Sequence, residues 1–219
     1  MTPDAEVRIA GRALARAGLV HAYGHCSARL GTGVIVVSPA APLGLVAPDD
    51  VCPMVPLDGP LPATVLGEVR MHRAVYRSRA DVGAICRIQP PAVMALSVLG
   101  RSPRAVHGFS SYFAGGVPMF DSPVLVRDDA AAEAVAELLG GAAAIVLRGN
   151  GALVVAPDLR TAVCLAWYLE DTARTELAVL PAGSDVCLLT ADEAERRATW
   201  EGGLAERMWA YLTAGDREL

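Results

Sequence analysis

The chain has 219 residues, of which 53% are hydrophobic and 20% charged, a composition typical of a globular protein. Its net charge is −5 and its arginines form no cluster, which argues against nucleic acid as a partner, because that binding depends on neutralising phosphates. No apolar run reaches the roughly 18–20 residues that span a bilayer, and the first residues lack the order of a signal peptide. We therefore expect a cytoplasmic protein with no membrane partner.

Two features of the composition limit the chemistry. Five scattered cysteines form no CxxC pair, which is typical of reduced thiols and not of a cysteine metal site. The chain contains no lysine, so Schiff-base chemistry through lysine, including lysine-linked PLP, is impossible here.

The first third of the chain alternates helical and strand patterns. Thr2 and Pro3 predict the start of a helix that continues to about residue 17. The short β-branched run 33–38 predicts a strand, which a Pro/Gly-rich loop follows. Apolar residues at helical spacing predict a helix over 64–79.

The middle of the chain is less regular. The apolar run 82–88 predicts a strand, and the two prolines that follow it predict where the strand ends. A helix is expected over 91–99, followed by a loop-like segment over 103–122 and a short strand over 123–126.

The last part of the chain predicts a hairpin between helices. A helix is expected over 129–139, two strands around a Gly-Asn-Gly turn over 143–156, and a long helix over 158–179. Thr190 and Glu193 form a capping-box pattern for a last helix that carries Trp200, Trp209 and Tyr211. Strands that alternate with helices indicate a mixed α/β layer fold.

Three segments together resemble the class II aldolase/adducin family: "GHCSAR" (24–29), "GEVRMHRAVYRSRADVGAICRIQPP" (67–91) and "LRGNGALVVAPDLRTAVCLAWYLEDTAR" (147–174). The family patterns are G-N-x-S-x-R, then E-x-x-x-H-x-x-x-Y…D-V-x-A-V-x-H-x-H-P-P, then L-x-N/G-H-G followed by L-E-x-x-A. The segments "VSPAAPLGLVAPDDVCPMVPLDG", "GGVPMF" and "LRGNG" are closer to the decarboxylase-like branch than to the sugar-phosphate aldolases.

The resemblance implies a fold and an assembly. It implies an α/β/α layered fold around a central mixed, mainly antiparallel sheet, in a single domain over residues 1–219. The core of that domain would cover 5–180, with a helical C-terminal segment over 181–219. A homotetramer with active sites between subunits is also implied, with the C-terminal segment reaching toward a neighbour's pocket.

The resemblance further implies a divalent metal held by three histidines, but none of the three is present. Both histidines of H-x-H and the one before the hairpin glycine correspond here to Arg87, Gln89 and Asn150. Arginine stays protonated and would repel a metal ion, and amide carbonyls are weak ligands for zinc-like metals. We therefore expect no metal site and no cofactor.

Glu68 and Arg87 are the first candidates for catalysis. Glu68 matches the acid/base glutamate of the family. The Arg87 guanidinium could replace the positive charge of the metal and bind a carboxylate or enolate, or it could form a buried ion pair with Glu68. Gln89 and Asn150 would donate or accept hydrogen bonds at the same ligand, or make ordinary polar contacts.

The first motif supplies further candidates. His25 replaces the usual asparagine, and because histidine titrates near neutrality it could donate a proton or bind an anion; the alternative is a hydrogen-bonded loop residue. Ser27 and Ser38 match hydroxyls that bind anions in the aldolases, although the loop after Ser38 is longer here and does not favour phosphate. His72 is expected to be structural.

His107, Phe109 and Tyr112 fall in the loop-like segment and could form a wall that binds an aromatic ring; core packing is the alternative. Together the candidates predict a metal-independent lyase of specialised metabolism, a decarboxylase or another enzyme of carbon–carbon bond cleavage. Its partner would be a small carboxylated metabolite, either aromatic or not. An isomerase, dehydratase or cyclase on the same fold, and a non-catalytic protein with this fold, are the alternatives.

Overall fold

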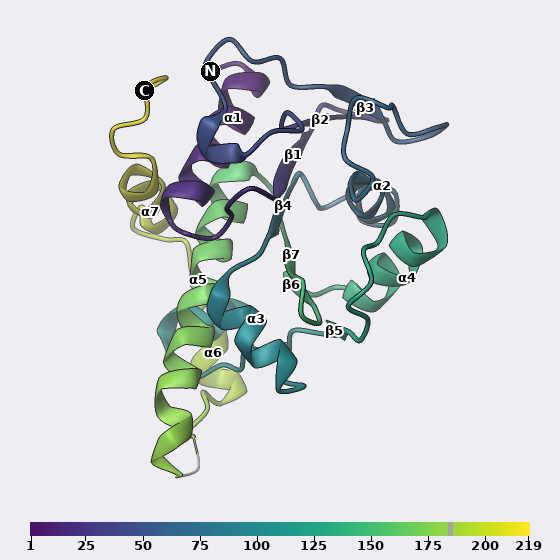
Figure 1. Cartoon of the computed structure of the whole chain (residues 1–219). Helices are drawn as coiled ribbons and strands as arrows, with labels where there is room; N and C mark the ends of the chain where they lie inside the picture. The colour runs from purple at the N-terminus through teal and green to yellow at the C-terminus, as the bar shows by residue number, and fades with distance from the viewer. Residues whose placement is uncertain (184–185) are drawn as a thin grey trace.

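Helices cover both faces of a central sheet in this protein (Figure 1). The computed structural model describes residues 1–183 and 186–219. The seven strands have the order β3-β2-β1-β4-β7-β6-β5, and every neighbouring pair is antiparallel except β5 and β6. The predicted α/β fold with a mixed, mainly antiparallel sheet is confirmed. The strands are β1 His25–Arg29, β2 Val34–Val37, β3 Met54–Pro56, β4 Ala84–Ile88, β5 Met119–Phe120, β6 Ala144–Leu147 and β7 Gly151–Ala156.

Two layers of helices pack on the sheet, because successive strand residues point to opposite faces. On β4, Cys86 belongs to the core under α1, α3, α5 and α7, whereas Ile85 belongs to the core under α2 and α4. No helix in the part of the chain that the structure describes is long and apolar enough to cross a membrane. The helices are α1 Pro3–Arg16, α2 Val69–Ser78, α3 Pro91–Val98, α4 Asp129–Leu139, α5 Leu159–Val179, α6 Ala191–Arg197 and α7 Leu204–Thr213, with short 3-10 turns η1 Leu43–Leu45, η2 Gly108–Phe113 and η3 Leu180–Ala182.

Some predicted elements were wrong in extent or place. The helix expected over 64–79 begins only at Val69, after turns that include Gly67. Glu68 therefore lies at the N-terminal end of α2 and not inside it. Residues 123–126 form no strand; β5 lies earlier in the chain, and Pro123 lacks the N–H that would extend the pairing.

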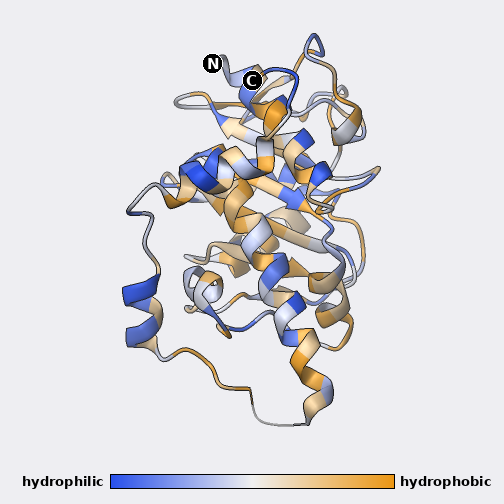
Figure 2. Cartoon of the chain, turned by 90° about the vertical axis from the view of Figure 1, so that its left-hand side faces the viewer, coloured by the Kyte–Doolittle hydropathy of each residue, from blue (hydrophilic) through white to orange (hydrophobic). Residues whose placement is uncertain are grey.

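The strands β1 and β3 were not predicted. The sequence of β1 is mostly polar and shows no clear apolar pattern, and β3 has only three residues. The C-terminal segment contains two helices instead of one. Thr190 does cap α6 as predicted, but Gly202 and Gly203 adopt positive φ and separate α6 from α7. Figure 2 shows that α6 is mostly hydrophilic, and its charged side chains agree with that.

A buried carboxylate holds the helix that follows β4. Pro91 starts α3, and the Glu170 side chain of α5 accepts hydrogen bonds from the Ala92 and Val93 amides, each at 3.1 Å. These amides have no partner within the helix, so Glu170 satisfies them and its charge is stabilised by the helix N-terminus. The L-E pair of the third motif thereby fixes the chain just beyond the end of β4.

Candidate active site

The candidate site lies between the centre of the sheet and α2. Arg87 on β4 pairs directly with His25 on β1, and both side chains are buried on the face that α2 covers. Gly24 lets the chain enter β1 at this point, since its φ is +124° and a Cβ there would lie 2.5 Å from a methyl of Val20.

Helix α2 directs three polar side chains toward the same place. Glu68, His72 and Tyr76 are spaced four residues apart, so they lie along one side of the helix. Ser27 Oγ on β1 lies 2.7 Å from His72 Nδ1 and 2.9 Å from the Tyr76 hydroxyl. The rings of His25 and His72 are in contact, with centroids 4.6 Å apart.

Arg87 is a buried cation with little internal compensation. Its Nη1 donates to the Ile88 carbonyl at 2.7 Å, and its Nη2 lies 3.4 Å from Glu68 Oε1, a long contact for an ion pair. Its side chain is 1% exposed, whereas that of Glu68 is 18% exposed. Burial lowers the pKa of Arg87 from its usual 12.5, and Glu68 opposes that shift. The arrangement therefore favours a further anion beside the guanidinium.

Both buried histidines are neutral at physiological pH. Burial, followed by the proximity of His72 and Arg87, holds the pKa of His25 well below 6.5. Burial and the Arg87 charge lower the pKa of His72 to about 3. The expectation that His25 titrates near neutrality is therefore wrong, because a desolvated ring beside a cation resists protonation.

Acid is expected to destabilise the protein through His72. The folded ring stays neutral down to a pKa of about 3, whereas the unfolded residue takes up a proton below its usual 6.5. The unfolded state thus binds more protons, and the free energy of unfolding falls by about 2 kcal/mol for this residue between about pH 7.5 and about pH 5. Urea denaturation at the two pH values measures the loss. His72→Asn should reduce it and His21→Asn, at an exposed position, should not; an undiminished loss in His72→Asn would contradict the assignment.

Gln89 and the turn that carries Asn150 lie at the same end of β4. The backbone amide of Gln89 donates to the Leu19 carbonyl at 2.9 Å, and its side-chain Oε1 is buried and has no partner in the described part of the chain. Asn150 lies in the turn between β6 and β7, beside Gln89, because Gly151 packs against the end of β4: a Cβ on Gly151 would lie 2.1 Å from the Ile88 carbonyl oxygen. The turn that carries Asn150 is thus held at the same end of the sheet as Arg87.

Unsatisfied polar atoms concentrate at this site. Buried polar groups in proteins almost always have hydrogen-bond partners, so a cluster of buried polar atoms that lack such partners indicates a place for a ligand or water. Five such atoms lie here: Nδ1 and Nε2 of His25, Nε2 of His72, Nε of Arg87 and Oε1 of Gln89.

The hydroxyls of the two predicted serines have partners within the protein. Ser38 Oγ accepts from the Cys26 amide at 3.2 Å, which ties β2 to β1. Ser27 Oγ contacts His72 and Tyr76, as described above. Their predicted role in binding a ligand stays a prediction.

The structure places His107, Phe109 and Tyr112 on η2, against α5. Phe109 stacks on Tyr168 at 4.5 Å between centroids, and Tyr112 stacks on Trp200 at 4.5 Å. His107 Nδ1 accepts from the Phe109 amide at 3.1 Å. The described contacts of these three side chains involve η2, α5 and the C-terminal segment, not Arg87 or Glu68, so the structure does not bring the two groups together.

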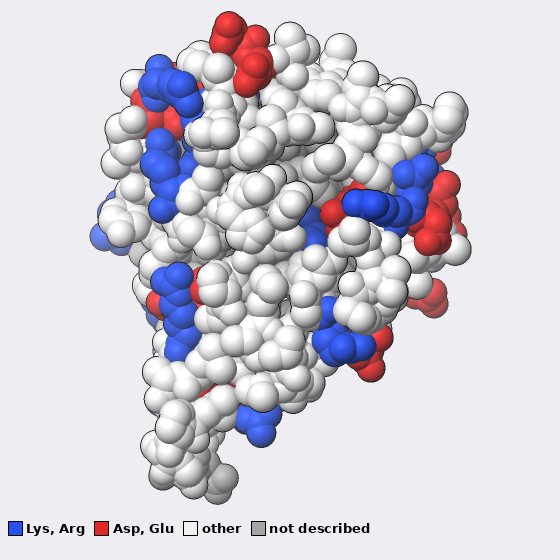
Figure 3. Space-filling view, viewed as in Figure 1, with Lys and Arg blue, Asp and Glu red and all other residues white. Residues whose placement is uncertain are grey.

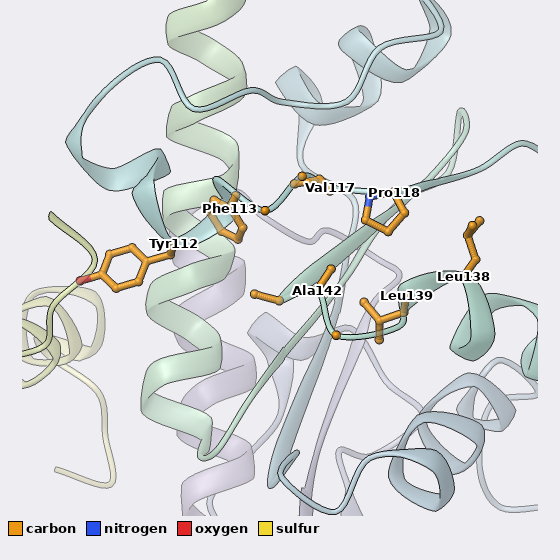
Figure 4. Close-up of a pocket in the computed structure, with 11 residues that line it drawn as sticks. Tyr112, Phe113, Val117, Pro118, Leu138, Leu139 and Ala142 are labelled. Atoms are coloured by element: carbon orange, nitrogen blue, oxygen red, sulfur yellow. The ribbon is translucent and has the colours of Figure 1, made fainter. Parts of the chain in front are cut away.

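A hollow of about 730 Å³ lies beside the turn that carries Val117 and Pro118. Figure 4 shows that Leu138 and Leu139 form one side of it, while the Tyr112 ring points away toward the C-terminal segment. Apart from the Tyr112 phenol its lining side chains do not titrate, so the hollow offers few groups for proton transfer.

The charged surface agrees with a small-molecule site. Figure 3 shows arginine and acidic side chains next to each other in small groups on the face it displays, with wide neutral areas between them. This face offers no broad basic surface of the kind that binds nucleic acid.

Residues 5–177 match the Class II Aldolase and Adducin N-terminal domain family. The chain belongs to this family. The 3,4-dihydroxyphthalate decarboxylase of Arthrobacter keyseri is 29% identical over 195 residues, which cover 81% of this chain and 78% of that protein. The enzyme of the same name from Rhodococcus jostii is 29% identical over 139 residues, covering 61% of this chain but only 55% of the relative's length. The predicted decarboxylase-like branch is confirmed.

Solved structures show the same fold. The L-fuculose-1-phosphate aldolase from Thermus thermophilus has a TM-score of 0.74 and 29% identity, covering 84% of this chain and 98% of that chain. The L-fuculose 1-phosphate aldolase from Glaciozyma antarctica has a TM-score of 0.80 at 20% identity, covering 96% and 88%.

The residues of this chain do not fit the metal that the family resemblance implies. Arg87, at one of the three matching positions, has five N–H donors and no lone pair for a metal, and its buried charge would repel one. Gln89 and Asn150 bring only amide groups. Within residues 1–183 and 186–219, no group of three or more His, Cys, Asp or Glu side chains is placed to hold a metal ion.

The contacts of His72 and Tyr76 with Ser27 were not predicted from the sequence. His72 was expected to be structural, and Tyr76 was only one residue of a helical pattern. Their signal was the spacing of four residues after Glu68, which directs all three side chains to the face that meets β1.

Proposed function

We propose that this protein is a metal-independent decarboxylase of a small aromatic carboxylate. The observation that carries the proposal is Arg87, a buried cation whose only acidic contact among residues 1–183 and 186–219 is the long one to Glu68. The relatives named 3,4-dihydroxyphthalate decarboxylase support the reaction class and the aromatic substrate. An arginine where the resemblance implies a metal ligand supports positive charge supplied by the protein itself.

In the proposed reaction Arg87 binds the substrate anion through its charge. The bond between the carboxylate carbon and the ring breaks, carbon dioxide leaves, and the bonding electron pair stays on the ring. Guanidinium N–H groups stabilise that negative charge as it develops. The ring carbon then takes a proton from Glu68 in its carboxylic acid form, which lies beside Arg87, or from the N–H of the neutral His25. The donor regains one proton from solvent before the next turnover, so the proton consumed by the ring is replaced. Gln89 and Asn150 would orient the ligand at the end of β4.

Purified protein is expected to release carbon dioxide from 3,4-dihydroxyphthalate, and dialysis against EDTA should leave the rate unchanged. Glu68→Gln should lower kcat by about 10²–10⁴-fold, the range for loss of a proton-transfer group. Glu133→Gln, an exposed carboxylate on α4, is the matched control and should keep the wild-type rate. Loss of activity in EDTA that a divalent ion restores would refute metal independence.

If the protein converts the substrate to an isomer or a dehydrated product and releases no carbon dioxide, the isomerase, dehydratase or cyclase alternative is favoured. No turnover and no ligand binding would favour a non-catalytic protein. The homotetramer and the cytoplasmic location stay predictions, which light scattering and cell fractionation test.

A further inference from the structure

A chain of hydrogen bonds runs from α2 into β1 beneath the candidate site. The Tyr76 hydroxyl lies 3.1 Å from the Ser27 carbonyl oxygen and 2.9 Å from Ser27 Oγ. Ser27 Oγ also lies 2.7 Å from His72 Nδ1. All three side chains are buried, at 0–2% exposure, so water does not compete for these contacts.

Which group donates in each of these hydrogen bonds follows from the Ser27 carbonyl, where the series ends. A carbonyl oxygen can only accept, so the single proton of the Tyr76 hydroxyl goes to Ser27 O. Tyr76 Oη can then only accept from Ser27 Oγ, which uses the single proton of the serine hydroxyl. Ser27 Oγ must therefore accept from His72, and the neutral imidazole carries its proton on Nδ1.

The other ring nitrogen of His72 is consequently an acceptor without a partner. Nε2 is buried, unprotonated and makes no hydrogen bond with any residue that the structure describes. The neighbouring His25 ring packs against it at a tilt of 40° instead of donating to it. Desolvating a lone pair without a partner is costly, which makes a donor from a ligand favourable at this point.

We infer that His72 is a specificity residue whose Nε2 accepts a hydrogen bond from a hydroxyl group of the substrate. This inference rests on the proposed function and narrows its substrate class to hydroxylated aromatic carboxylates. Arg87 binds the carboxylate, and His72, whose ring lies 4.6 Å from that of His25 between centroids, recognises the hydroxyl. A ligand with the carboxylate alone leaves Nε2 unsatisfied and binds more weakly.

The first test is the protonation of His72 in the wild-type protein without ligand. A long-range ¹H–¹⁵N spectrum of protein labelled in its four histidines, assigned with His72→Gln, separates the two neutral tautomers. We expect a proton on Nδ1 from about pH 6 to about pH 8. A proton on Nε2 overturns the inference, whether or not the protein proves to be a decarboxylase.

The second test compares two ligands by calorimetry, 3,4-dihydroxyphthalate and phthalate, which lacks the hydroxyls. Wild type should bind the hydroxylated ligand about tenfold more tightly, as expected for one buried hydrogen bond with an unsatisfied acceptor. Tyr76→Phe removes the oxygen that accepts the hydroxyl proton of Ser27. The Ser27 hydroxyl then donates to Nδ1 of His72 instead, and the single proton of the neutral His72 ring moves to Nε2. That variant should lose the tenfold preference and keep its affinity for phthalate.

Tyr211→Phe, at an exposed tyrosine on α7, is the matched control and should keep the preference. Equal wild-type affinity for the two ligands overturns the inference, as does a Tyr76→Phe variant that stays folded and retains the preference. Absence of carbon dioxide release alone refutes the proposed function and not the hydrogen-bond assignment, because neither the tautomer nor the binding preference depends on turnover.

Discussion

Arg87→Met is expected to abolish catalysis and at the same time to stabilise the fold. Loss of the guanidinium removes the charge that binds the substrate anion, so kcat/KM should fall by about 10³-fold or more. The same change removes a buried cation whose pKa is lowered by burial and whose contact to Glu68 is 3.4 Å long. Glu68 is 18% exposed and keeps its contact with water, so replacing the buried cation by an apolar side chain of similar length should raise the free energy of unfolding.

Urea denaturation and the decarboxylation assay measure the two effects separately. Arg29→Met is the matched control, since Arg29 donates to the carbonyls of Val82, Tyr76 and Arg79 and lies over the Tyr76 ring. That variant should lose stability, because three acceptors lose their donor. A loss of stability in Arg87→Met together with unchanged activity would show that Arg87 is a structural residue.

Asp216→Ala is expected to lower the free energy of unfolding by about 3–5 kcal/mol, the range for breaking a buried ion pair from one side. Arg12 and Asp216 form a bidentate ion pair, in which Nη2 donates to Oδ1 at 2.6 Å and Nε donates to Oδ2 at 2.8 Å. The side chains of Asp216 and Arg12 are 0% and 4% exposed. Arg12 also contacts Glu218 at 2.6 Å, and Arg8 contacts Glu218 at 2.7 Å. The end of the chain is thereby bound to α1, and the variant leaves Arg12 buried with two of its four hydrogen bonds, those to Val46 and Glu218.

Chemical denaturation measures this loss, and a double-mutant cycle identifies its origin. Arg12→Met combined with Asp216→Leu should recover much of the stability, because no uncompensated charge remains. Arg196→Met is the control, since its pair with Asp192 on α6 is exposed and contributes little. A loss of less than about 1 kcal/mol in Asp216→Ala would contradict the account.

Local patterns were sufficient for much of the fold. The apolar run 82–88 predicted β4, and Pro90 and Pro91 predicted its end. The Gly-Asn-Gly segment predicted the turn between β6 and β7, since Gly149 and Gly151 adopt positive φ there. The predicted start of α2 was wrong: the helix begins at Val69, because the turns before it owe their stability to the surrounding protein and not to the local sequence.

The order of the residues by itself determined that arginine, glutamine and asparagine stand where the resemblance implies histidines, and that Glu68 precedes them. Side-chain chemistry alone then argued against the metal. Only the tertiary structure decided which of these groups meet. Pairing of β1 with β4 sets His25 opposite Arg87, and packing of α2 on that face brings His72 and Tyr76 to Ser27. Such contacts join residues about 45–60 positions apart, so their register depends on the whole sheet and not on local sequence.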